Sequence, residues 1–561
     1  LRTVAGMGWQ VMADFESYER AREGFSWELP ESFNPGVDFC RKHDADRVAL
    51  RYDTDSGVEE FTFGEIDRRS DRLASAFENL GIDPGDRVGV LVSQKPANPI
   101  THLANWKLGA VSVPLTVLFG PDALQYRLAD SDAVAVVVDA AVSEKIEAVR
   151  DECPALEHVV ELRAGDSSDG GAAERAQYRG FESLLSEGET GFDAHDATPE
   201  TETAVMYTSG STGPPKGVVH SHALWLGRAA AAYNYFDRGL DGAATLWTPA
   251  DWAWGAALGG TLFAGWHHGA TVVGRPRDSF DPEAAVGCLA RHDVTHAFMP
   301  PTALRMLQSV DDPRERYDLS LSVIASAGEP LTPEVVAWGE RELPGVSINE
   351  FYGQTELNLV VGNSADWFEV RPGSMGRPLP GYEAAILDPE TRERVPRGEV
   401  GELAVKPGDR RVFFDEYLGL PEKTAEKRTD DGWFLTDDLC RRDEDGYLWF
   451  VSRADDVILT SGYRVGPMEV ESAILEHPAV EQAGVVGVPD ETTGEAIKAF
   501  VKPVEWPEDP GDLREEIRAL VRENLAAYEY PEYVEFVEEL PTTSTGKIRR
   551  KSLRERELDG E

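Results

Sequence analysis

The 561-residue sequence has few cysteines, few lysines and no long apolar run. Its four cysteines, Cys40, Cys153, Cys288 and Cys440, lie far apart and lack the close spacing of metal ligands. This pattern argues against a cysteine-based metal site and suits a reducing cytoplasm. No apolar run approaches the roughly 20 residues of a membrane helix. The first residues also lack the charged start and apolar core of a signal peptide. We therefore expect a cytoplasmic globular protein with no membrane span.

Positive charge is also scarce. Only 55 residues are basic against 101 acidic ones, which gives a net charge of −46, and only twelve of the basic residues are lysines. Such a field repels nucleic acid and anionic membranes, so neither is an expected partner. An acidic, lysine-poor composition is typical of proteins from a salt-saturated cytoplasm, and an ordinary acidic protein is the alternative.

Hydrophobic patterning predicts an α/β protein. Residues 61–80 have helical apolar spacing, and residues 133–139 form the β-branched run of a buried parallel strand. A second alternation of strands and helices follows from residue 246, including a helix over 282–291 and a strand over 321–326. Residues 376–451 read as short strands and turns, which indicates a small β subdomain.

These patterns define the expected architecture. A large N-terminal domain of layered α/β sheets with a β subdomain should cover residues 1–454, and a small mobile α+β domain should cover residues 455–561. Residues 164–200 are rich in Gly, Ser, Asp and Glu and read as an exposed insertion or linker. Ser221 is expected to be the N-cap of a helix that ends near residue 235.

The sequence is organised around residues 207–217, Tyr-Thr-Ser-Gly-Ser-Thr-Gly-Pro-Pro-Lys-Gly. A short apolar strand precedes this stretch. Glycines allow close backbone approach to a ligand, and hydroxyls with a lysine complete an anion site for a polyphosphate. The spacing differs from that of a Walker A loop. A flexible surface turn is the alternative for an arbitrary loop of this composition.

Two further polar loops follow predicted strands. Residues 327–330 read Ala-Gly-Glu-Pro after one strand. The next strand, predicted over residues 347–351, leads into the second loop, so that residues 350–356 read Glu-Phe-Tyr-Gly-Gln-Thr-Glu. Loops at the carboxyl edge of an open α/β sheet form the usual ligand crevice. We therefore expect a ligand site where these loops meet.

Seven strings in a fixed order resemble the adenylate-forming superfamily of acyl-CoA synthetases, luciferases and peptide-synthetase adenylation domains. They are the three loops above and residues 371–378, 453–458, 461–467 and 541–547. The resemblance runs from about residue 55 onward and is closest to the medium-chain, AMP-forming acyl-CoA synthetases.

The resemblance implies an acid–thiol ligase that uses ATP, Mg²⁺ and coenzyme A. The carboxylate attacks the α-phosphorus of ATP to form an acyl-adenylate, and the CoA thiol then displaces AMP. The expected substrate is a short- to medium-chain acid, the expected context fatty acid metabolism, and the expected assembly a monomer or homodimer. The alternatives are an enzyme that prefers acetate or propionate, one with another acceptor, and a non-catalytic nucleotide-binding module.

Family roles transfer to the ATP site residue by residue. Contacts to the β,γ-phosphates are implied for Thr208, Ser209, Gly210, Ser211, Thr212, Gly213 and Lys216. An adenine slot, with Tyr352 stacking on the base, is implied for Gly328, Glu329, Pro330, Glu350, Phe351 and Tyr352. Gly353 and Gln354 continue this site. Thr355 would contact the α-phosphate, and Glu356 with Thr212 would serve the Mg²⁺.

Other family roles fall near the C-terminus. Asp438 corresponds to the ribose-binding aspartate, although the usual Thr-Gly-Asp reads Thr436-Asp437-Asp438 here. Arg453 and Arg464 match arginines near the ribose and phosphate, and Asp455 matches the interdomain hinge. Lys547 looks like the lysine that stabilises charge during adenylation. Ser461, Gly462 and Tyr463 would line the path of the CoA arm.

Two residues are expected in the acyl pocket. Acetate-specific relatives carry a tryptophan at the position of Gly353, so glycine should leave room for a longer chain. Trp254 is a second candidate lining residue, and a plain core aromatic is the alternative for it.

The net charge generates a first prediction. Because the Debye length falls to about 3 Å at 1 M salt, self-repulsion is screened there. Both the melting temperature and the activity should rise between dilute buffer and about 1 M KCl. A melting temperature that is independent of salt, with full activity in dilute buffer, would contradict the halophilic interpretation.

Overall fold

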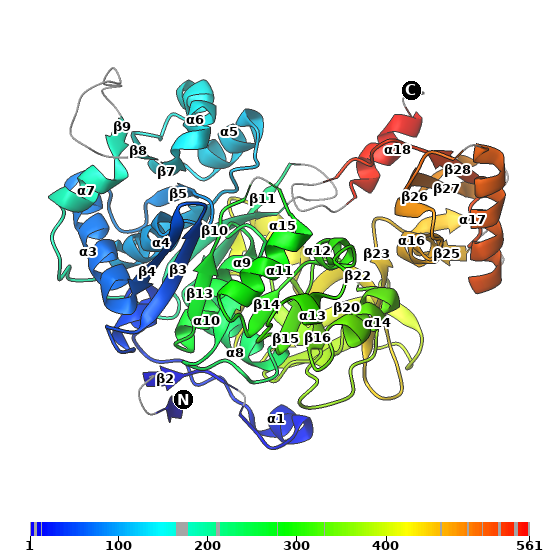
Figure 1. The fold of residues 1–561 in the computed structure, drawn as a ribbon, viewed down its shortest axis with the longest axis horizontal. Helices are drawn as coiled ribbons and strands as arrows, with labels where there is room; N and C mark the ends of the chain where they lie inside the picture. Colours follow the sequence, from blue (N-terminus) through cyan, green and yellow to red (C-terminus); the bar gives the residue numbers. More distant parts are fainter. Residues whose placement is uncertain are drawn as a thin grey trace. The chain divides into compact units, whose positions relative to one another are not determined.

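A computed structural model describes the chain in segments, and residues between these segments are not described. The segments are residues 2–4, 8–12, 14–163, 178–208, 214–277, 279–329, 331–460, 463–490, 493–507, 509–525, 529–542 and 548–558. The chain forms two compact units (Figure 1): residues 1–383 with 406–434, and residues 384–405 with 435–561. The expected domain boundary after residue 454 therefore falls inside the second unit, because the preceding short strands group with the C-terminal part.

The first unit contains an eight-stranded sheet in which two neighbouring strands flank the predicted phosphate loop. Its spatial order is β21 (Glu416–Tyr417), β11 (Lys216–Ser221), β10 (Glu202–Thr208), β6 (Val111–Pro114), β5 (Arg87–Leu91), β7 (Ala135–Asp139), β8 (His158–Leu162) and β9 (Tyr178–Gly180). The five residues of β7 are all buried, as a parallel strand covered on both faces requires.

A nine-stranded sheet carries the other two predicted loops. Its order is β18 (Arg377–Pro378), β17 (Asn358–Gly362), β16 (Ser347–Gln354), β15 (Val323–Ser326), β14 (His296–Phe298), β12 (Thr245–Trp247), β13 (Thr271–Gly274), β3 (Val48–Thr54) and β4 (Gly57–Thr62). Strands β12 to β16 pair in parallel, so their carboxyl ends share one edge. The predicted α/β fold class is confirmed.

Helices cover these sheets. In the first unit they are α1 (Tyr18–Gly24), α2 (Pro35–Arg41), α3 (Phe63–Asn79), α4 (Ala97–Leu108), α5 (Pro121–Asp130), α6 (Ser143–Val149), α7 (Phe181–Glu187), α8 (Ala223–Tyr235), α9 (Gly255–Ala257), α10 (Ala264–His267), α11 (Pro282–Arg291), α12 (Pro301–Leu307), α13 (Pro313–Arg316), α14 (Pro333–Glu342) and α15 (Pro421–Glu426). A one-turn π-helix occupies Leu258–Phe263. A small hairpin pairs β1 (Arg2–Val4) with β2 (Gly8–Gln10).

Two helices lie at the centre of the core. All residues of α4 and of α8 are buried, and Trp106 on α4 packs on Trp225 of α8 with ring centroids 4.9 Å apart. Full burial of α8 places each of its polar side chains inside the protein. Polar groups there require partners, because desolvation is costly.

The second unit holds two smaller sheets. One has the order β19 (Tyr382–Leu387), β20 (Val400–Pro407), β22 (Phe434–Arg442) and β23 (Leu448–Arg453). The other joins β25 (Tyr463–Val465), β24 (Ile458–Thr460), β27 (Gly494–Pro503), β26 (Val480–Asp490) and β28 (Tyr533–Phe536). Its helices are α16 (Pro467–Leu475), α17 (Pro510–Asn524) and α18 (Arg550–Leu558). The β subdomain and the α+β character of the C-terminal part are confirmed.

Two expectations about local structure are wrong. Ser221 is the last residue of β11 and does not cap α8, whose N-cap is His222 without a side-chain hydrogen bond. Residues 178–187, expected to lie in a linker, form β9 and α7, because Phe181, Leu184 and Leu185 are buried. The remainder of that stretch up to residue 177 lies outside the described residues.

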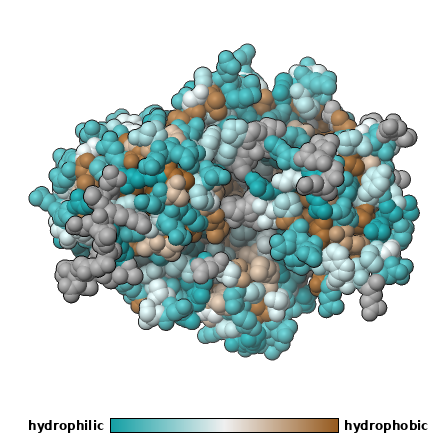
Figure 2. Space-filling view, turned by 90° about the horizontal axis from the view of Figure 1, so that it is seen from above, coloured by the Kyte–Doolittle hydropathy of each residue, from teal (hydrophilic) through white to brown (hydrophobic). Residues whose placement is uncertain are grey.

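The surface is mostly polar. Figure 2 shows hydrophilic residues over most of the face in view, with apolar residues in scattered places. This distribution agrees with the high content of acidic residues. No helix in the described part of the chain is long and apolar enough to cross a membrane.

Candidate active site

The predicted phosphate loop connects two paired strands. Strands β10 and β11 run antiparallel, with Thr208 opposite Lys216. The side chains of both residues are half-buried, whereas the strand residues Ala204 and Val205 are fully buried. The intervening Ser209, Gly210, Ser211, Thr212 and Gly213 lie outside the described residues. The expected strand before the loop is confirmed, and Lys216 begins the returning strand.

Tyr417 joins two residues that the sequence assigns to phosphate and metal binding. Its hydroxyl donates to Oε1 of Glu356 over 2.8 Å, and Nζ of Lys216 lies 4.4 Å from the centre of its ring. Glu356 is buried, and its carboxylate oxygens are the hard ligands that Mg²⁺ prefers. The structure thus brings Lys216 and Glu356 to the same tyrosine. Sequence analysis missed Tyr417, because no motif marks it.

The loop after β15 shows why glycine stands at position 328. Gly328 has φ +104°, a conformation that residues with a side chain rarely adopt. The next residue, Glu329, accepts hydrogen bonds from Nη2 of Arg305 at 2.8 Å and from Oγ1 of Thr302 at 3.0 Å. The carboxylate is therefore fixed by its neighbours. Pro330 lies outside the described residues.

Glu350 is a buried carboxyl group in the middle of β16, which continues to Gln354 and so passes the end predicted at residue 351. Burial raises its pKa to about 8, and the hydrogen bond from the amide of Leu331, at 3.3 Å, lowers it slightly. A group with this pKa is mostly protonated at neutral pH. Glu350 can then donate a hydrogen bond to a nitrogen or oxygen acceptor of a ligand.

The side chains of the motif at residues 350–356 divide between core and accessible edge. The ring of Phe351 stacks on Tyr235, with centroids 4.1 Å apart and planes within 10°. Phe351 is thus a core residue through its side chain, and only its backbone remains for the expected adenine slot. Tyr352, Gly353, Gln354 and Thr355 are half-exposed at the carboxyl edge of the sheet. These residues are accessible to a ligand, as predicted.

Trp254 lies on the same edge, in the loop after β12. Asp251 holds this loop, because its carboxylate accepts from Oγ1 of Thr116 at 2.5 Å and from the amide of Ala253 at 2.9 Å. The side chains of Trp252 and Ala257 are buried, and the intervening residues 253–256 are half-exposed. Trp254 therefore faces an accessible edge, unlike a plain core aromatic.

The predicted ribose aspartate belongs to the second unit. Asp438 is buried, and its Oδ1 lies 3.5 Å from Nη1 of Arg453. The preceding Asp437 has φ +59°, the left-handed conformation that favours glycine. This conformation explains the departure from Thr-Gly-Asp: the backbone keeps the shape of a glycine turn, and aspartate is one of the few other residues that tolerate it.

Arg453 is held by the three carboxylates of Asp437, Asp438 and Asp455. Its Nε lies 3.1 Å from Oδ1 of Asp455, the residue expected at the hinge. Burial opposes the charge of Arg453, but these carboxylates raise its pKa, so the guanidinium stays charged. Asp455 itself is exposed in a turn.

The remaining predicted residues are not described in atomic detail. Ser461, Gly462 and Lys547 lie outside the described residues. For Tyr463 and Arg464 only the backbone is described, at the start of β25. Their roles stay predictions.

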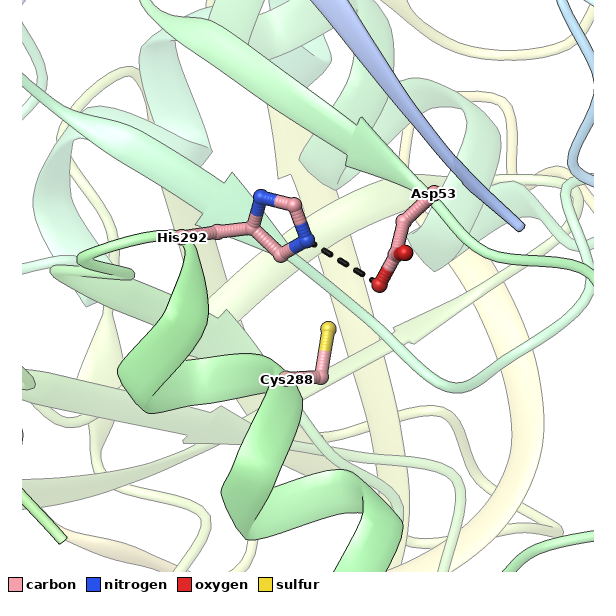
Figure 3. A group of neighbouring side chains, drawn as sticks. All are labelled: Asp53, Cys288 and His292. Atoms are coloured by element: carbon pink, nitrogen blue, oxygen red, sulfur yellow. Dashed lines mark hydrogen bonds and ion pairs between the residues drawn. The ribbon is translucent and has the colours of Figure 1, made fainter. Parts of the chain in front are cut away.

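A group of potential metal ligands lies elsewhere in the first unit. Asp53, Cys288 and His292 face one another, and Nε2 of His292 lies 3.0 Å from Oδ2 of Asp53 (Figure 3). The same carboxylate pairs with Arg275 at 2.8 Å and Arg291 at 3.1 Å. Burial also raises the pKa of the Cys288 thiol to about 12. Two arginine cations and a protonated thiol disfavour a metal ion, so we interpret the group as an ion-pair cluster that joins β3 to α11.

Comparison with protein families decides the identity of this site. Residues 38–409 match the family model of the AMP-binding enzymes, and residues 469–547 match that of the AMP-binding enzyme C-terminal domain. The chain belongs to the AMP-binding enzymes. This confirms the predicted adenylate-forming superfamily and the class of acid–thiol ligase, and it leaves the acid open.

Curated relatives of this AMP-binding enzyme cover nearly its whole length. It is 33% identical to the mouse mitochondrial acyl-coenzyme A synthetase ACSM3, over 97% of the chain and 94% of the relative. It is 36% identical to the acetyl-coenzyme A synthetase of Bacillus subtilis, over 91% and 88%. Among solved structures, the anthranilate CoA ligase AuaEII with anthranoyl-AMP superposes with a TM-score of 0.85 at 29% identity, over 95% and 99% of the two chains.

The structure does not support an open space at Gly353. A Cβ atom there would collide with the carbonyl oxygen of Asn358 and lie 2.9 Å from Cα of Leu359. Both are backbone atoms of the antiparallel pair β16–β17, whose register shifts at Tyr352 and Gly353. Close backbone approach thus explains the glycine. The expectation that Gly353 leaves room for a longer acid is corrected, because the backbone of β17 occupies that space.

This geometry predicts the outcome of substitution at Gly353. Gly353→Ala should already lower kcat/KM, and Gly353→Trp should lower it for acetate, butyrate and octanoate alike, because β17 must move in both variants. Parallel kinetics on the three acids check this. If Gly353→Trp spared acetate and lost at least about 100-fold on octanoate, as expected when room for two or more methylenes disappears, Gly353 would be a size gate after all.

Proposed function

We propose that this enzyme ligates a short- to medium-chain carboxylic acid to coenzyme A, with ATP converted to AMP and pyrophosphate. The observation that carries the proposal is the arrangement of Lys216 and Glu356 around Tyr417, beside the hairpin that holds the phosphate loop. In this arrangement a cation that could bind phosphate lies near a carboxylate that could hold the Mg²⁺ accompanying ATP, which supports the proposal. The names of the mouse and Bacillus relatives support the same chemistry.

The first half-reaction forms the acyl-adenylate. An oxygen of the acid carboxylate forms a bond to the α-phosphorus of ATP, and the bond to the bridging oxygen breaks as pyrophosphate leaves. Lys216 and the loop at residues 208–213 would hold the leaving phosphates, and Thr355 would contact the α-phosphate. Glu356 would hold Mg²⁺, which offsets phosphate charge when bound. Catalysis of this kind rests on positioning and charge neutralisation.

The second half-reaction transfers the acyl group. The CoA thiol attacks the acyl carbonyl, loses its proton, and AMP leaves with the electrons of the broken C–O bond. Asp438 would hold the ribose, Arg453 and Arg464 would lie near the ribose and phosphate, and the loop at residues 461–463 would guide the CoA arm. We place this reaction in cytoplasmic fatty acid metabolism, carried out by a monomer or homodimer.

An acid panel with a lysine variant tests the function. Wild-type enzyme with MgATP, CoA and acids from acetate to decanoate should release AMP with the highest kcat/KM for a short- or medium-chain acid. Lys547→Ala should lower adenylate formation by roughly 10²-fold or more, the scale for one lost transition-state donor. Thioester formation from synthetic acyl-adenylate and CoA should survive. Equal loss in both half-reactions would reject the role of Lys547, and no AMP with any acid would reject the function.

Asp455 tests the hinge separately. Asp455→Pro fixes φ near −65° and removes one backbone donor, so rotation about this residue should be blocked. Adenylate formation should persist while thioester formation collapses. Asp455→Ala is the matched control, because it removes the ion pair to Arg453 but keeps the backbone free. A proline variant whose two half-reactions keep their wild-type ratio would place the hinge elsewhere.

A further inference from the structure

Arg228 is a fully buried arginine with weak partners. It lies on α8 with a side chain 2% exposed. Nη1 donates to the carbonyl oxygen of Gly255 at 2.5 Å, and Nη2 lies 3.7 Å from the sulfur of Met206. The guanidinium also lies 5.7 Å from the ring centre of Trp225. A carbonyl, a thioether and an indole face are neutral, so none of them balances its charge.

Several buried or half-buried cations have carboxylate partners. Lys107 pairs with Asp67 and Asp71, both at 2.6 Å, and Lys42 pairs with Asp38 at 2.8 Å. Arg275 pairs with Asp53. Among the described residues, no carboxylate pairs with buried Arg127, which donates to the carbonyl of Ala123 and lies 4.1 Å from the ring centre of Phe119. In the part of the chain that the structure describes, no carboxylate forms an ion pair with Arg228 either. In a sequence with 101 acidic residues, the missing partner leaves the charge of Arg228 available to a negative or polar group from outside the chain.

The surrounding backbone is shaped for the guanidinium. A Cβ atom at Gly255 would lie 2.8 Å from Nη1 of Arg228, and one at Gly259 would collide with Cδ. Gly259 lies in the π-helix Leu258–Phe263, a rare element that occurs frequently at functional sites. Two glycines and a π-helix thus leave a cradle that the side chain of Arg228 fills.

Two buried polar atoms near this cradle lack hydrogen bonds. Nε of Arg228 and Oη of Tyr382 have no hydrogen-bond partner among the described residues. Nε atoms of several other arginines, including Arg127, also lack a partner there, so it is the position beside the two glycines that distinguishes Arg228. Burial lowers the pKa of Arg228 to about 10, with Tyr235 and Tyr382 opposing this shift, so the guanidinium is charged at neutral pH.

The cradle lies directly behind the accessible edge of the candidate active site. Gly255 follows Trp254, both are half-exposed, and Gly255 has no side chain to cover the guanidinium. Met206 precedes Tyr207 and Thr208 on β10. Burial lowers the pKa of His220 to about 3, and the nearby charge of Arg228 adds to this shift.

We propose that Arg228 forms the far end of the acyl site and selects carboxylic acids that carry a hydrogen-bond acceptor at their distal end. The acceptor is a hydroxyl, a carbonyl or a second carboxylate. Arg228 is then a residue that determines substrate specificity, a role that the sequence had suggested for Gly353. This inference rests on the proposed acid–CoA ligation.

Pairs of acids of equal length test the proposal. AMP release with CoA is measured for hexanoate, 6-hydroxyhexanoate and hexanedioate. The wild type should favour the two acceptor-bearing acids over hexanoate by about 10-fold or more in kcat/KM, because unpaired polar groups in a site reject an analogue that lacks their partner. Arg228→Met, similar in length and uncharged, should remove this preference, and Arg228→Lys should keep it in weaker form. Arg275→Met is the matched control and should leave it unchanged.

The outcomes separate the inference from the function beneath it. A wild type that favours hexanoate, or an Arg228→Met variant that loses activity on all three acids alike, would overturn the role of Arg228 while ligation stands. The wild-type comparison needs no variant, so a misfolded Arg228→Met cannot hide the result. AMP release with no acid would overturn the proposed ligation, and the role of Arg228 with it.

Discussion

The contacts of residues 414–417 connect the two parts of the first unit that we propose bind ATP. The amide of Phe414 donates to the carbonyl of Glu356, and that of Asp415 donates to the carbonyl of Val219, both at 2.8 Å. Tyr417 pairs with Val218 on β11 and bonds Glu356 through its hydroxyl. One short segment thus ties the hairpin of the phosphate loop to the motif at residues 350–356, although about 140 residues of chain separate them. If it shifted, Lys216 and Glu356 would lose their common partner.

Much of the fold is predictable because local signals agree with tertiary packing. The helix predicted over 282–291 has these bounds in the structure, since Asp281 caps it and Pro282 occupies its first turn. Strand β7 follows its β-branched run. Strand β26 covers Val480–Asp490, and its polar end residues are paired with β27 in a ladder that an apolar pattern cannot reveal.

The candidate site is predictable where a motif names a residue, and not where tertiary contacts decide its role. Glu356 was assigned from its motif, but its partner Tyr417 has no sequence signal. Glycine at position 353 suggested open space in the acyl pocket, but the backbone of β17 occupies that space. Phe351 was assigned to the nucleotide with its neighbours, yet its ring completes the core stack with Tyr235. Asp437 shows the reverse case. It replaces the glycine of the usual Thr-Gly-Asp motif, but its positive φ keeps the backbone conformation of that glycine.

The buried cations of this acidic protein differ in the partners that surround them. The enclosed cations Lys107 and Lys42 have acidic partners, and each such pair offsets the desolvation of both groups. Lys107 is fully enclosed by Asp67, Asp71 and Ser70 and so serves the packing of α4 on α3. Arg228 on the equally buried α8 has neutral neighbours and a glycine-lined cradle. An ion pair such as that of Lys107 stabilises the packing of the fold. A buried cation without an acidic partner destabilises the free protein and can be stabilised by a bound ligand. The contrast between these two helices is therefore the physical reason to assign α4 to stability and α8 to substrate choice.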